Sequence, residues 1–385
     1  MGDLATATIL AALVMIASIV SVESGVSVAI IEITLGVVAA NVLGVRTTPW
    51  IDFLGSFAGI VLTFLAGAEV DPALLGRKWK PAVIIGGLSF LLPFVGVGLF
   101  ARYVAGWNVP QSEIAGIALS TTSLAVVYAV LVERGLNRSN VGKLLMSATF
   151  VTDLCTALAL SAIFIKPNVW FPVFIAVSVA LILALPKLAP LFFGRYGDRV
   201  IEPEIKLVFV ALLALMVLAD ASNGHAVLPA FILGLVMSRH YEQHREEQKR
   251  LRIVAFAFLT PFFFIKGGLN VSLGAVFSNL GLLGALLLAK MVPKIAFIYP
   301  LARRAVPRHA TFTTLLMSTG LTFGTISALY GLTAHIVDKT QFSLIITVVV
   351  VSAVVPTAIA ERWFLPDEPA KAERPSAPVP AEEFV

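Results

Sequence analysis

Long apolar stretches occupy almost the whole of this 385-residue chain. About 20 apolar residues in helical form span the hydrocarbon core of a bilayer. Charged residues make up 13% of the chain, against about 25% in soluble domains. The pattern therefore predicts an all-α polytopic membrane protein with about 13 transmembrane helices, near residues 4–22, 26–44, 51–69, 81–103, 112–131, 144–165, 169–193, 206–221, 225–239, 253–270, 278–300, 311–332 and 342–360.

Basic residues are unevenly distributed over the loops between these runs. The odd-numbered loops carry clusters of Lys and Arg, at residues 77–80, 134–143, 187–206, 239–252 and 303–308, whereas the even-numbered loops carry few. Loops rich in Lys and Arg stay in the cytoplasm. We therefore expect a multi-pass protein of the bacterial inner membrane with its N-terminus outside and its C-terminus in the cytoplasm. The net charge of +5 is explained by these loops, so the lipid bilayer is an expected partner and nucleic acid is not.

Asp153 is the only charged residue between Lys143 and Lys166, in the middle of an apolar run. An ionisable group at membrane depth is costly and normally faces a water-filled cavity or a partner charge. Asp153 is therefore the first candidate for an ion or proton site. Thr152, directly before it, could add a hydroxyl ligand.

Two runs contain polar patches that weaken a helix. The fifth contains Ser120, Thr121, Thr122 and Ser123, and the twelfth contains Ser318, Thr319, Gly320, Thr322, Gly324 and Thr325. Ser and Thr side chains compete with the helical ladder, and Gly weakens it. Matched interruptions in two inverted halves indicate a transporter site near the midplane. The alternative is that these small residues only let helices pack closely.

Several segments in this order resemble the monovalent cation:proton antiporter-2 family, which includes bacterial sodium/proton exchangers and potassium efflux systems. They are FLAGAEVDP (64–72), the STTS patch followed about thirty residues later by Thr152 and Asp153, PAFILGLVMS (229–238), TPFFFIKGGLNV (260–271) and LLLAKMVPKIAFIY (286–299). The resemblance implies inverted repeats with two crossing broken helices, in a homodimer that moves by an elevator-like mechanism. It implies a membrane domain over residues 1–364, with a six-helix core near 81–165 and 278–360 and a dimerisation scaffold near 1–70 and 169–270.

The resemblance also implies a lysine in the eleventh span that pairs with the Asp in the ion-free state. Lys290 is the favoured match and Lys294 the lesser one, which could instead reach toward the cytoplasmic surface. The family's residue before the Asp is often Asp, Asn or Gln, whereas here it is Thr152. A further departure is Lys266, which places a charge in the tenth span.

These features predict a secondary-active antiporter in which a monovalent cation, Na⁺ or K⁺, and H⁺ compete for Asp153. Such a protein serves pH homeostasis. A single carboxylate favours electroneutral one-for-one exchange, although titration of Lys290 would make the cycle electrogenic. The alternatives are a channel-like K⁺ efflux protein and a non-transporting ion-sensing membrane subunit. Residue types do not distinguish Na⁺ from K⁺ or Li⁺.

Other motifs carry little functional signal. The sequence has no P-loop, no HExxH and no nucleophile elbow, so neither an enzyme nor a cofactor is expected. Residues 365–385 are rich in Pro, Ala and Glu and are expected to form a disordered cytoplasmic tail. His240 and His244 are spaced for metal binding on one helix face, but in a polar basic stretch we interpret them as surface histidines.

Overall fold

The computed structural model describes residues 2–70, 72–136, 139–165, 167–197, 199 and 201–366. The predicted tail from residue 367 on, and Lys166, lie outside the described residues. The helices are α1 (Asp3–Ser24), α2 (Val28–Asn41), α3 (Pro49–Ala68), α4 (Pro72–Tyr103), α5 (Val109–Ser120), α6 (Leu124–Glu133), α7 (Asn140–Phe164), α8 (Phe171–Tyr196), α9 (Pro203–Ala221), α10 (Val227–Gln243), α11 (Arg245–Val254), α12 (Thr260–Leu269), α13 (Leu273–Ser278), α14 (Leu280–Pro293), α15 (Tyr299–Ala305), α16 (Ala310–Met317), α17 (Thr322–Thr333) and α18 (Lys339–Trp363).

The predicted all-α membrane fold is confirmed. Among the described residues, 10 helical segments are long and apolar enough to cross a membrane. Every predicted run coincides with a helix or with a pair of consecutive half-helices. Three of these matches, α2, α9 and α10, fall outside the 10, so the number of crossings stays a prediction.

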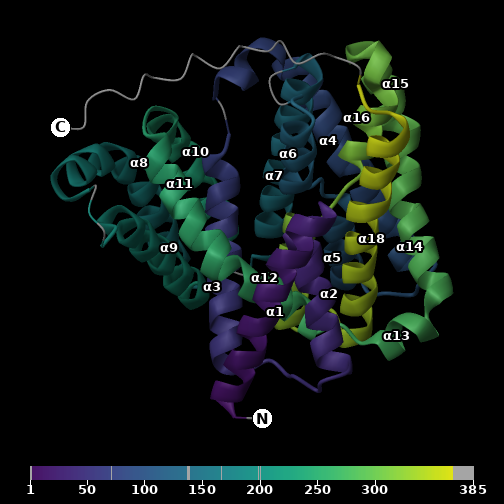
Figure 1. Cartoon of the computed structure of the whole chain (residues 1–385), viewed down its shortest axis with the longest axis horizontal. Helices are drawn as coiled ribbons and strands as arrows, with labels where there is room; N and C mark the ends of the chain where they lie inside the picture. Colours follow the sequence, from purple (N-terminus) through teal and green to yellow (C-terminus); the bar gives the residue numbers. More distant parts are fainter. Residues whose placement is uncertain are drawn as a thin grey trace.

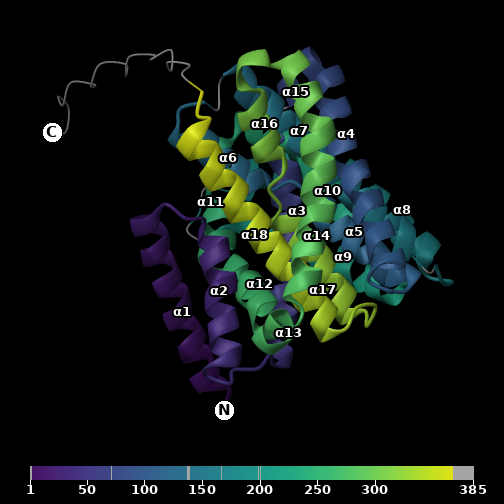
Figure 2. The same ribbon diagram turned by 90° about the vertical axis from the view of Figure 1, so that its right-hand side faces the viewer.

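The helices pack in two groups. In the first, α10 packs against α3 and α8, α12 packs against α2 and α3, and α8 packs against α9. In the second, α4 packs against α5, α7 and α14, while α17 packs against α5 and α18. Figure 1 shows α8 to α11 on one side of the molecule and α14, α15 and α18 on the other. Figure 2 shows α1 along the outer side of α2. The two groups meet where α10 contacts α7 and where α17 contacts α3 and α12.

Reciprocal glycine contacts hold two helix pairs of the first group together. A Cβ at Gly234 of α10 would lie 2.0 Å from the Phe64 carbonyl oxygen, and one at Gly67 of α3 would lie 2.1 Å from the Phe231 carbonyl oxygen. The pair α2 and α12 has the same arrangement at Gly36 and Gly268. Without a Cβ the backbones approach directly, which is how small residues drive helix association in membranes.

We expect Gly234→Ala to destabilise the protein by about 1 to 3 kcal/mol, because the added methyl group overlaps backbone that cannot rotate away. Gly281→Ala is the matched control, since a Cβ at Gly281 in α14 meets nothing within 4 Å. Replacing an unconstrained helical Gly with Ala is favourable by up to about 1 kcal/mol. Thermal unfolding in one detergent measures both variants, and equal melting temperatures would contradict the close approach.

Prolines locally widen two of the helices. A π-helical turn at Ala255–Leu259 precedes Pro261, and a second at Lys294–Ile298 precedes Pro300. A proline offers no N–H to the carbonyl one turn earlier, so a neighbouring N–H takes over the bond in a wider turn. Such π-bulges are frequent at functional sites. The second one begins at Lys294.

Candidate functional site

Asp153 lies in the middle of α7 and is buried, with 2% of its surface exposed. Its Oδ1 atom has no hydrogen-bond partner in the described part of the chain. The preceding Thr152 directs its hydroxyl to carbonyls, that of Gly86 in α4 at 3.2 Å and that of Ala148 at 3.0 Å. A Cβ at Gly86 would lie 2.3 Å from the Ala148 oxygen. Thr152 therefore ties α7 to α4 at a close crossing, and the Asp153 carboxylate keeps an open coordination position.

Two interrupted helices cross beside α7. The first interruption covers residues 121–123 between α5 and α6, and the second covers residues 318–321 between α16 and α17. The Thr122 hydroxyl donates to the Met317 carbonyl at 2.8 Å. The Ser123 N–H donates to the Thr319 hydroxyl at 3.4 Å. These bonds join the two interruptions to each other.

Lys294 fills the centre of this crossing. Its Nζ atom donates to the Thr121 carbonyl at 2.8 Å, the Met317 carbonyl at 2.9 Å and the Thr122 hydroxyl at 3.2 Å. These carbonyls are at the C-terminal ends of α5 and α16, where the helix dipole favours a cation. The ammonium group also interacts electrostatically with Asp153. Lys294 is fully buried, so the expectation that it reaches toward the membrane surface is wrong.

The two lysines of α14 and the following turn have different surroundings, and which of them pairs with Asp153 stays a prediction. Lys290 is also fully buried, but its Nζ atom donates to the Ser352 hydroxyl of α18 at 2.6 Å. It lies at the edge of the crossing, where a Cβ at Gly320 would come within 2.6 Å of its Nζ atom. Lys294, one turn further along the chain, is close enough for its charge to act on Asp153.

The other predicted residues shape the interruptions. The Ser123 hydroxyl accepts from the Val126 N–H at the start of α6. Ser318 and Thr319 donate to carbonyls within α16. Thr322 is the half-buried first residue of α17. These side chains satisfy backbone groups that the broken helices leave free.

A cavity of about 600 Å³ leads toward the crossing. It lies between Leu124 and Tyr128 of α6 and Met146 of α7 on one side, and the end of α3 with α10 and α11 on the other. Its rim carries the ion pair of Glu69 with Arg252, at 3.3 Å. Leu124 directly follows the first interruption. The cavity therefore stops short of Asp153, on the side of the basic segment 239–252.

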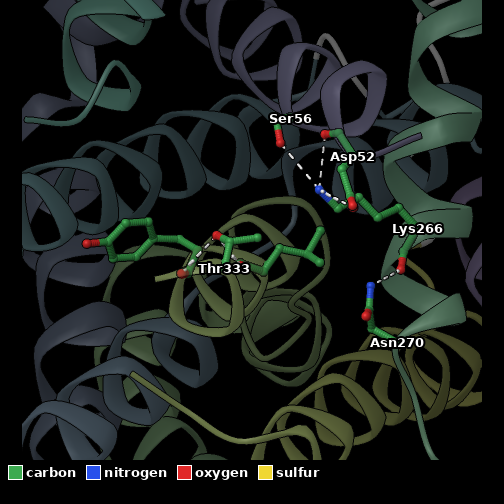
Figure 3. Close-up of polar contacts among 7 residues, drawn as sticks. Asp52, Ser56, Lys266, Asn270 and Thr333 are labelled. Atoms are coloured by element: carbon green, nitrogen blue, oxygen red, sulfur yellow. Dashed lines mark hydrogen bonds and ion pairs between the residues drawn. The ribbon is translucent and has the colours of Figure 1, made fainter. Parts of the chain in front are cut away.

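Lys266 forms a separate polar cluster within the first group of helices. Its Nζ atom lies 3.2 Å from the Asp52 carboxylate, 3.1 Å from the Asp52 carbonyl and 3.3 Å from the Ser56 hydroxyl. Figure 3 shows this cluster between α3 and α12, with Asn270 bonded to the Lys266 carbonyl and Thr333 of α17 across from it. A Cβ at Gly55 would lie 2.6 Å from the lysine stem. The charge in the tenth span is thus paired locally, away from the crossing.

We expect Asp52→Asn to lower stability by about 1 to 2 kcal/mol, because Lys266 is 3% exposed and loses the charge of its partner. Lys266→Met should cost less, since it removes the desolvated charge itself. Asp220→Asn, at an exposed carboxylate, is the control. Urea or thermal unfolding of the three variants measures the difference; a larger loss in Lys266→Met would contradict this account.

Two contributors were not identified from the sequence. The Met317 carbonyl accepts hydrogen bonds from both Lys294 and Thr122. Every residue carries a backbone carbonyl, so the sequence does not indicate which one has this role. Ser352 was visible as a lone hydroxyl in an apolar run.

Two helices interrupted at a common crossing, with a buried carboxylate and a buried lysine beside them, define a membrane protein of the secondary-transporter class. The match to a family model is more specific. The model described as "Sodium/hydrogen exchanger, transmembrane" matches residues 8–364. The chain belongs to this family.

Individual relatives agree with the assignment. Probable Na(+)/H(+) antiporter 3 of Methanocaldococcus jannaschii is 29% identical over 269 residues, which are 67% of this chain and 68% of that protein. Na(+)/H(+) antiporter NhaS4 of Synechocystis is 23% identical over 247 residues, which are 59% of this chain and 60% of that protein. The solved structure of the sodium proton antiporter MjNhaP1 from Methanocaldococcus jannaschii at pH 8 is 13% identical, with a TM-score of 0.69 over 93% of this chain and 97% of that one. The structural likeness shows the fold.

Proposed function

We propose that this protein is a secondary-active antiporter that exchanges Na⁺ for H⁺ across a bacterial inner membrane. The carrying observation is the buried Asp153 carboxylate, which has an unpartnered oxygen next to Lys294 at the crossing. Family membership and the names of its relatives support Na⁺ as the cation. K⁺ is the competing substrate, to be decided by measurement.

The cation would replace the Lys294 ammonium. That group is held by the Thr121 carbonyl, the Met317 carbonyl and the Thr122 hydroxyl, all within 3.2 Å. Hard oxygens of this kind suit alkali cations, as the carbonyl rings of selectivity filters do. When a cation binds to Asp153 and these oxygens, the lysine loses its partners and moves away. Protonation of Asp153 has the opposite effect, because it removes the charge that binds the cation. One carboxylate then couples the two flows in a one-for-one exchange.

Alternating access would move the crossing between the two membrane faces. The 600 Å³ cavity separates α6 and α7 from α3, α10 and α11, which supports a mobile core near residues 81–165 and 278–360 and a scaffold near 1–70 and 169–270. The paired glycine contacts support inverted repeats. In such repeats the second apolar run (α2) would be equivalent to the ninth (α10), and the third (α3) to the tenth (α12). The contact between α2 and α12 then corresponds to the contact between α10 and α3. We assign the scaffold to the interface of a homodimer and the movement to an elevator.

The basic segments support an inward-facing cavity. Arg134 after α6 pairs with Glu361 near the end of α18, at 3.5 Å. Figure 1 shows the start of α1 and α13 at one end of the molecule and the turn between α15 and α16 at the other. With the basic loops in the cytoplasm, the N-terminus is outside and the cavity opens to the cytoplasm.

Proton flux in vesicles tests the proposal. Purified protein is reconstituted with a pH-sensitive dye inside, and Na⁺, K⁺ or Li⁺ is added outside. We expect Na⁺ to drive proton movement, with an apparent KM that rises as the pH falls while the maximal rate is retained, since both ions compete for one group. Cation flux without proton movement would favour a channel. Cation binding without any flux would favour an ion-sensing subunit. A sizeable current at zero potential would refute one-for-one exchange.

A further inference from the structure

A cluster of potential metal ligands lies at the junction of α10 and α11. His240 is in the last turn of α10, His244 is the residue between the helices, and Glu247 is in the first turn of α11. One ligand atom from each side chain lies within 4.8 Å of those of the other two. The cluster is remote from the crossing and takes no part in the proposed exchange.

The ligand atoms are arranged as in a partly assembled site. His240 Nε2 lies 2.7 Å from Glu247 Oε2. The two imidazole rings stack with centroids 4.4 Å apart and an angle of 13° between their planes. Donor atoms bound tetrahedrally to one Zn²⁺ at about 2.0 to 2.1 Å lie roughly 3.3 Å apart. Because parallel rings direct their lone pairs along parallel planes, the exposed His244 ring must rotate about χ2 before all three donors reach one ion.

The surroundings of both histidines suit metal ligation. His244 Nδ1 lies 3.1 Å from the His240 carbonyl oxygen. A backbone carbonyl in this position fixes the proton on Nδ1 and leaves the Nε2 lone pair for a metal, which is the usual support of a ligating histidine. His240 is 7% exposed in its side chain and packs edge-on against Phe193 of α8, with ring centroids 5.3 Å apart. The site is thus held from the α8 side and open toward His244, which is exposed.

Two of the nearby cations already lie close to carboxylates, which reduces their repulsion of a divalent ion. Arg250 lies 3.6 Å from Glu202 and 3.9 Å from Glu204. Lys249 lies 3.8 Å from Glu246. The Glu247 carboxylate therefore remains available to neutralise part of the charge of a bound metal.

We propose that His240, His244 and Glu247 bind a divalent first-row transition metal of the Zn²⁺ type, which clamps the turn between α10 and α11. Two histidines and a carboxylate are a ligand set typical of zinc, with a fourth position for water. The neighbouring residues Tyr241, Glu242 and Arg245 line the cavity. A bound metal would fix this part of the cavity wall.

Zn²⁺ titration of the purified full chain, after removal of any affinity tag, tests the site. We expect one Zn²⁺ per chain by calorimetry. Losing a residue that only orients a ligand typically reduces affinity about 10- to 100-fold, so removing a ligand in His244→Ala or Glu247→Gln should reduce it at least that much. His335→Asn is the control. It removes a histidine elsewhere, at a residue with φ of 55°, a conformation that Asn tolerates. Co²⁺ gives a second readout through the visible absorption of a tetrahedral complex.

Hydrogen exchange tests the clamp separately. Zn²⁺ should slow amide exchange in residues 243–247 of the wild type and leave it unchanged in His244→Ala. Equal Zn²⁺ affinity in the wild type and both ligand variants would overturn the metal site. Binding that leaves exchange in the turn unaltered would overturn the clamp. Because these readouts do not involve transport, their outcome is independent of whether the protein exchanges Na⁺ for H⁺.

Discussion

Replacing Asp153 with Asn is expected to abolish cation-driven proton flux. The substitution keeps the shape of the side chain and removes the charge that both ions need. A unit charge at about 4 Å from a cation contributes about 4 kcal/mol at an effective dielectric constant of 20, so affinity for Na⁺ should fall roughly a thousand-fold. The dye assay in reconstituted vesicles measures the loss, and calorimetric Na⁺ titration measures binding without transport.

Glu32→Gln is the matched control for this variant. Glu32 is as deeply buried as Asp153, and its Oε2 atom also has no partner in the described residues. It lies in α2, outside the crossing, so the variant should retain Na⁺-driven proton flux. Asp153→Asn with normal flux, or Glu32→Gln without flux, would show that the carboxylate has been assigned to the wrong helix.

Lys294→Met is expected to remove exchange and also to destabilise the protein. Met has nearly the length of Lys without its charge, so the Thr121 and Met317 carbonyls lose charged hydrogen bonds. Hydrogen bonds to charged groups contribute about 1.5 to 3 kcal/mol each. We therefore expect a loss of about 2 to 5 kcal/mol in the free energy of unfolding, together with vesicles that show no Na⁺-driven flux.

Lys290→Met provides the comparison within the same helix. Lys290 makes one bond, to the Ser352 hydroxyl, and that hydroxyl itself donates to the Val349 carbonyl. Its loss should lower stability less than the loss of Lys294. Thermal unfolding of both variants, measured at two Na⁺ concentrations 100-fold apart, separates an effect on stability from an effect on ion binding. If Lys290→Met is the more damaging of the two, the order of the lysines drawn from the structure is incorrect.

The sequence predicted the helices well because the bilayer fixes their length. Apolar runs of about 20 residues have few alternatives in lipid, and each run coincides with helical structure. The interruptions at residues 121–123 and 318–321 were found for a related reason: clustered Ser, Thr and Gly are unusual inside such runs. Asp153 was identified because an isolated charge inside an apolar run is energetically costly and is normally retained for a function.

The details of the site could not be predicted in the same way. Lys290 and Lys294 are four residues apart and share a helix face, so residue type does not tell them apart. In the structure Lys294 donates to carbonyls of both interruptions, whereas Lys290 donates to Ser352. The sequence predicted Thr152 as a cation ligand; in the structure its hydroxyl is directed to the Gly86 and Ala148 carbonyls. Such choices depend on which backbone groups a fold leaves free, and residue types do not encode them individually.

The glycine contacts between α3 and α10, and between α2 and α12, restrict where this molecule can change shape. Carbonyl oxygens there abut the facing main chain with no intervening layer of side chains. Sliding one helix along the other would bring main-chain atoms into steric clash, so we expect each helix pair to move as one rigid unit. We expect displacement to be easier along the boundary where α10 meets α7 and α17 meets α12, since side-chain rotamers can adjust there. Cross-links across this boundary, for example between α10 and α7, should therefore stop Na⁺-driven proton flux. Cross-links within a pair, for example between α3 and α10, should leave the flux unchanged.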